Sequence, residues 1–170
     1  MAKNQKKINP EDAIRQSLVT HEADFLVDKD SGNHRNLFYG LEMYVPDCYG
    51  TDKGVVRQLL GNFGCYANAG FSNDVQTVML DDRVADSIMS GNLDIDTKSL
   101  CKTVGKRADS LMFVRESSFL KWASDRVKMF PDRSSIELLD ILCGESVDDV
   151  IQKHGDEMMG NDGYMQEQLF

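Results

Sequence analysis

The hydrophobic residues of the chain fall into two patterns, short unbroken runs and sets spaced three or four residues apart. A short apolar run between polar residues is typical of a buried strand, whereas spacing of three or four predicts one face of a helix. The stretch SLMFVRESSFLKWASDRV (110–127) contains both patterns in succession. It predicts a strand over 111–114, then a helix that Ser117 caps and that ends near Phe130. The only tryptophan, Trp122, is predicted to face the core.

The same two patterns predict the other elements of the fold. Three further strands are predicted over 37–45, 65–69 and 75–80. Helix starts are predicted near Pro10, at Thr51 or Asp52, at Asp81 or Asp82, at Thr97, at a capping box from Ser134 to Glu137, and at Ser146. Strands separated by helices favour a parallel sheet that helices cover on both faces. We therefore expect an α/β fold with a small, mainly parallel four-stranded sheet flanked by helices, and extra helices at both ends.

Four segments differ in composition and pattern. Residues 1–36 are expected to form a basic arm followed by a helical extension, and residues 37–130 form the α/β domain. Residues 131–155 are predicted to add two helices. Residues 156–170 are acidic, contain glycine and show no periodicity, so a flexible tail is expected there.

Charge limits the classes of partner. The chain has 28 acidic and 19 basic residues and a formal net charge of -9. Non-specific nucleic-acid binding depends on Lys and Arg displacing counterions, so a broad nucleic-acid surface is not expected, although a local phosphate site is compatible with this charge. The start MAKNQKKINPED lacks the apolar region of a signal peptide, and no apolar run approaches about 20 residues. We expect a cytoplasmic protein without membrane contact.

The residue types that carry catalysis form no motif. The four cysteines lack CxxC spacing, which argues against a zinc ribbon or a redox pair, and the three histidines lie far apart. The stretch GTDKG (50–54) lacks the GK[ST] ending of a phosphate-binding loop. We therefore predict no catalytic residue, no metal and no cofactor.

Three motifs within about 37–130 resemble the BRCT domain of DNA repair and replication proteins. LFYGLEMYV (37–45) is similar to the first strand of that family, and VVRQLLGNFG (55–64) to its first helix and the following glycine turn. LMFVRESSFLKW (111–122) is similar to its fourth strand and last helix. Two features depart from the pattern: Gly64 stands where the family often has two glycines, and the family's tryptophan position holds Phe119, with Trp122 one turn later.

The resemblance implies a place where phosphate would bind. Family members that bind phosphate use a Ser or Thr and a backbone N–H after the first strand, with a lysine from the second helix. These groups donate hydrogen bonds to phosphate oxygens. The nearest candidates here are Thr51, with Lys98 or Lys102, and Asp47 would repel the phosphate. The alternative is that Thr51 only caps a helix and that both lysines are solvated.

The last five residues, QEQLF, resemble the bacterial sliding-clamp binding motif, Gln-x-x-Leu-Phe. In this interpretation Leu169 and Phe170 fill an apolar pocket of the clamp and Gln166 fixes their orientation by hydrogen bonding. The alternatives are that the two apolar residues dock on the domain of the same chain, or that the match is accidental.

These features together favour a non-catalytic interaction or scaffold protein of DNA replication or repair. Its expected partners are proteins, with phosphorylated ligands, DNA ends and a sliding clamp as further candidates. Two alternatives stay open at this point: a small α/β enzyme of unknown reaction, and a purely structural dimerisation module.

Overall fold

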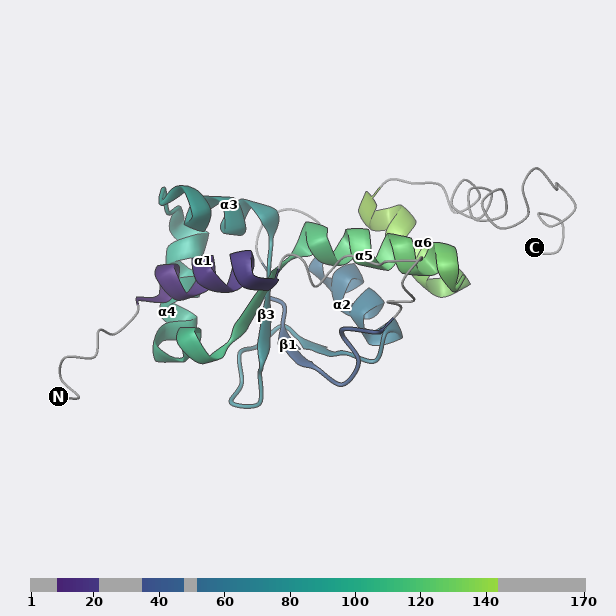
Figure 1. Ribbon diagram of the computed structural model, residues 1–170, viewed down its shortest axis with the longest axis horizontal. Helices are drawn as coiled ribbons and strands as arrows, with labels where there is room; N and C mark the ends of the chain where they lie inside the picture. The colour runs from purple at the N-terminus through teal and green to yellow at the C-terminus, as the bar shows by residue number, and fades with distance from the viewer. Residues whose placement is uncertain (1–8, 22–34, 48–51, 144–170) are drawn as a thin grey trace, which may run out of the picture.

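The structure, a computed structural model, describes residues 9–21, 35–47 and 52–143, which build a four-stranded sheet between two layers of helices (Figure 1). The strands are β1 (Glu42–Tyr44), β2 (Tyr66–Asn68), β3 (Thr77–Leu80) and β4 (Met112–Arg115). Their order across the sheet is β2-β1-β3-β4, and all neighbouring pairs are parallel. This confirms the predicted α/β fold, and it leaves β2 and β4 at the two edges of the sheet.

Helices cover both faces of this sheet. On one face lie α2 (Lys53–Asn62), α5 (Glu116–Met129) and α6 (Arg133–Cys143). On the other lie α1 (Pro10–His21), α3 (Asp82–Ser90), α4 (Ile95–Val104) and the 3-10 helix η3 (Gly105–Ser110). Figure 1 shows the two groups on opposite sides of β3. A parallel sheet needs this double cover because both of its faces are apolar.

Aromatic rings fill the core under α2, α5 and α6. Trp122 is 1% exposed, and its ring centroid lies 4.9 Å from that of Phe38 and 5.0 Å from that of Phe63. Phe119, one turn before Trp122 on α5, completes the group and is fully buried. The predicted burial of the tryptophan is therefore confirmed.

The core on the other face is mainly aliphatic and includes the N-terminal helix. Ile14 and Leu18 of α1 pack with Ile88 of α3 and Leu100 of α4. On the first face, the C-terminal helix α6 likewise contributes buried apolar residues to the aromatic core. The helices predicted as extensions before and after the domain therefore belong to its two cores.

The predicted strand over 37–45 is wrong at its start. Residues 37–40 form a turn, with Gly40 at φ 79°, and β1 begins only at Glu42. The segment is apolar, as the strand prediction required, but these residues lie in a turn. Phe38 packs from this turn into the aromatic core. The other three predicted strands are confirmed, with ends that differ by one or two residues.

Three predicted helix caps are wrong. The cap of α4 is Asp94, whose carboxylate accepts hydrogen bonds from the N–H and hydroxyl of the buried Thr97. Helix α5 begins at Glu116 without a side-chain cap. Helix α6 begins at Arg133, one residue before the predicted cap Ser134, and Glu137 pairs with Arg133.

Two further expectations concern exposure and extent. Phe130, near which the predicted helix ends, directly follows α5 and is 51% exposed. The predicted helix at Ser146 and the tail lie outside the described residues. Across the described ranges, none of the helices has the length and apolar character needed to span a membrane.

Candidate functional site

The carboxyl ends of β1, β3 and β4 define the most informative place on the sheet. In open parallel sheets ligands bind beyond the carboxyl ends of the strands, where the strand order reverses. Here that point lies between β1 and β3, because β2 lies on one side of β1 and β3 lies on the other. Asp81 follows β3 directly, and Glu116 follows β4 directly.

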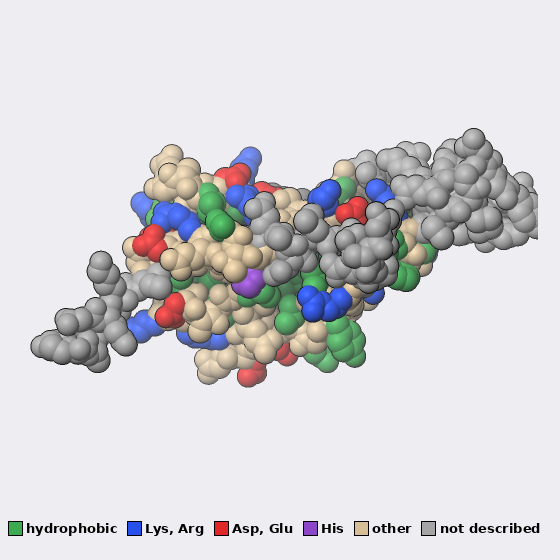
Figure 2. Space-filling view, viewed as in Figure 1, with side chains coloured by type: hydrophobic (Ala, Val, Ile, Leu, Met, Phe, Trp, Pro, Cys, Tyr) green, Lys and Arg blue, Asp and Glu red, His purple; other side chains and the backbone are tan. Residues whose placement is uncertain are grey.

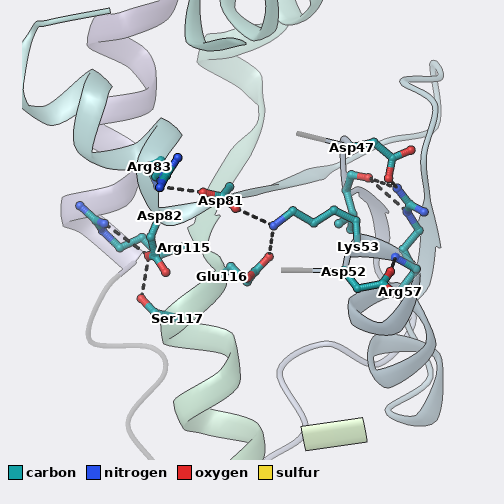
Figure 3. Close-up of polar contacts among 12 residues, drawn as sticks. Asp47, Asp52, Lys53, Arg57, Asp81, Asp82, Arg83, Arg115, Glu116 and Ser117 are labelled. Carbon is teal, nitrogen blue, oxygen red and sulfur yellow. Dashed lines mark hydrogen bonds and ion pairs between the residues drawn. The ribbon is translucent and has the colours of Figure 1, made fainter. Parts of the chain in front are cut away.

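A buried ion network occupies this position (Figure 3). Lys53, the first residue of α2, points its ammonium between the two carboxylates. Its Nζ donates to Asp81 Oδ2 at 2.7 Å and to Glu116 Oε1 at 2.6 Å. The three residues are between 4% and 6% exposed. The network thus ties together the starts of α2, α3 and α5.

The surroundings keep Lys53 protonated. Burial by itself would lower the pKa of the Lys53 ammonium, but the hydrogen bonds that it donates to Asp81 and Glu116 and the negative charges of both carboxylates outweigh burial and raise the pKa. A lysine acts as a base or nucleophile only after losing its proton, so this lysine is held in the unreactive form.

Two further groups of contacts lie around the network. At the start of α2, the Asp52 carboxylate accepts hydrogen bonds from the N–H groups of Gly54 and Val55. Arg57 of the same helix pairs with Asp47, which follows β1. These contacts place two carboxylates where the resemblance predicted an anion.

On the opposite side of the network, Arg115 at the end of β4 contacts two acids of α3. Its Nη1 lies 2.7 Å from Asp86 Oδ1 and 3.5 Å from Asp82 Oδ1. Ser117 donates its hydroxyl to Asp82 at 2.7 Å, instead of capping α5 as predicted. These bonds join the start of α5 to the start of α3 a second time.

The two lysines predicted to hold phosphate do not lie at the start of α2. Thr51 lies outside the described residues. Lys98 and Lys102 are exposed on α4, which packs against α1, α3 and η3 on the other face of the sheet. The lysine that the fold brings to the carboxyl ends of the strands is Lys53.

Sequence reasoning missed Lys53, although a signal was present. A lysine in the first turn of a helix is unfavourable beside the positive end of the helix dipole. An acidic side chain that compensates its charge is therefore expected nearby. Asp81 directly follows one predicted strand and Glu116 lies two residues after another, and the carboxyl ends of parallel strands lie at one edge of a sheet. Their convergence on Lys53 could have been inferred once a parallel sheet was expected.

The remaining points concern metal ligands, the cysteines and the clamp-binding residues. Within the described residues, no three His, Cys, Asp or Glu side chains are grouped closely enough to hold a metal ion. Burial raises the pKa of the Cys65 thiol to about 12 and that of Cys101 to about 11, whereas Cys143 is exposed. The predicted clamp-binding residues, Gln166, Leu169 and Phe170, lie outside the described residues.

In comparisons with known proteins, no protein-family model, no curated sequence and no solved structure matches this chain. The resemblance to BRCT domains therefore stays a prediction from three sequence motifs. The geometry of the carboxyl ends, in which one ammonium is bound by two carboxylates, is the main evidence on which a function can be argued.

Proposed function

We propose that this protein is a non-catalytic interaction module of DNA replication or repair that recruits partner proteins. The observation that carries this proposal is the Lys53 network. General acid–base and nucleophilic catalysis need a group that can change its protonation state beside the substrate. At the position where parallel α/β proteins bind ligands, Lys53 is instead buried and doubly paired, which supports a role in holding three helix starts together.

The cellular setting of the proposal comes from the sequence motifs. The three motifs that resemble BRCT domains and the terminal QEQLF both point to DNA replication and repair. We propose a sliding clamp as one partner, bound through Gln166, Leu169 and Phe170. Short segments lose conformational entropy when they bind, so micromolar affinity, about -8 kcal/mol, is expected.

The test uses the full chain, a chain without its last five residues, and purified sliding clamp. The full chain should capture the clamp, and the shortened chain should not. Replacing Leu169 and Phe170 together with alanine should weaken binding at least about a hundredfold, because each buried apolar side chain contributes roughly 1.5–3 kcal/mol. The melting temperature of this variant should equal that of the wild type.

Glu167→Ala is the matched control, since Glu167 occupies a variable position of the motif. It should bind the clamp as the wild type does. A wild type that does not bind the clamp, together with a double alanine variant that melts at a lower temperature, would mean that Leu169 and Phe170 dock on the domain of their own chain.

Phosphorylated ligands and DNA ends have weaker support. A phosphate at the start of α2 would compete with the Asp52 carboxylate for the N–H groups of Gly54 and Val55, and Asp47 lies nearby on Arg57. Titration with a phosphopeptide and its unphosphorylated form, repeated with Thr51→Ala and with the Lys98/Lys102 double alanine variant, measures this directly. Equal binding of both peptides would remove phosphate recognition and leave protein recruitment in place.

A further inference from the structure

We draw no further inference here: the strongest candidate, the shallow hollow of about 410 Å³ near the amino ends of β1 and β2 that is lined by Tyr39, Gly61, Cys65 and Tyr66, beside the hydrophobic side chains gathered at the lower right of Figure 2, carries no proposal because nothing in the described residues shows what covers it.

Discussion

The two helical layers of this protein close the same sheet by different means. The layer of α2, α5 and α6 uses large rings from separate segments, with Phe38, Phe63, Phe119 and Trp122 in edge-to-face contact. The layer of α1, α3 and α4 uses aliphatic and small side chains such as Ile14, Ala85 and Ile88. The comparison teaches that the stability of the first layer is concentrated in a few residues, whereas that of the second is spread over many.

The layers also treat the two edges of the sheet differently. Helix α1 packs along β4, and the Ser17 hydroxyl accepts the Phe113 N–H at 2.7 Å, so this edge is covered. Among the described residues, β2 has its sheet partner β1 on one side only. An edge that the chain closes itself is part of the fold, whereas Tyr66 and Asn68 at the other edge stay exposed.

The largest expected effect tests the concentration of stability in the aromatic layer. Trp122→Ala removes a ring that contacts Phe38 and Phe63, and it should lower the free energy of unfolding by about 3–5 kcal/mol. Urea unfolding of the purified full chain measures this change. Phe130→Ala, on the exposed side of the same region, is the control and should stay within about 0.5 kcal/mol of the wild type.

The next prediction concerns Lys53, which joins the two layers. Lys53→Met leaves the buried Asp81 and Glu116 without their cation, and should cost about 3–5 kcal/mol of unfolding free energy. Adding Asp81→Asn and Glu116→Gln to the same variant should restore much of this loss, because no unpaired charge is then buried. A Lys53→Met variant as stable as the wild type would show that the network does not hold the layers together.

The Lys53 network also predicts a dependence on pH. The folded-state pKa of Lys53 is raised above its ordinary value of 10.5, so its contribution to stability is complete below that value. The contribution is lost as the pH rises through the folded-state pKa. Wild-type stability should therefore fall in strongly alkaline solution, measured as the urea midpoint, and Lys53→Met should lack this part of the fall.

A smaller effect is expected at the covered edge. Ser17→Ala leaves the Phe113 N–H without its acceptor and should cost about 1 kcal/mol, within the range for an unsatisfied buried donor. Hydrogen exchange at the Phe113 amide should become faster. Gln16→Ala, at the exposed neighbouring position of α1, should change neither quantity. Unchanged exchange in Ser17→Ala would mean that α1 protects the edge by packing alone.

The smallest expected effect is a difference in reaction rate among the cysteine thiols, which leaves the fold unchanged. The pKa values of about 12 for Cys65 and about 11 for Cys101 leave little thiolate at pH 8, so both should react slowly with a thiol reagent in the native protein. The exposed Cys143 should react first. Mass spectrometry of the Cys48→Ser variant, which removes the cysteine outside the described residues, identifies the modified site. Rapid modification of Cys65 would show that the hollow beside it opens readily.

Local pattern predicted most elements of the fold but not all of their ends. The short apolar runs identified the strands, and the helical spacing around Trp122 identified its buried face, because both depend on residues close in sequence. The turn at residues 37–40 was missed because an apolar run does not reveal whether its residues pack from a strand or from a turn. The cap of α4 was misplaced because Asp94 and Thr97 are both good capping residues. Only the hydrogen bonds that Thr97 donates to the Asp94 carboxylate show that Asp94 is the cap.

The sequence by itself therefore determined the alternation of strands and helices, the class of fold and the burial of Trp122, since these follow from periodicity and hydrophobicity. Only the tertiary structure decided what lies at the carboxyl ends of the strands and near the amino ends of β1 and β2. Lys53, Asp81 and Glu116 meet because parallel strands bring their ends to one edge, and Lys98 and Lys102 are carried to the other face by α4. Tyr39, Gly61 and Tyr66 likewise share one hollow because of chain topology, which no local spacing encodes.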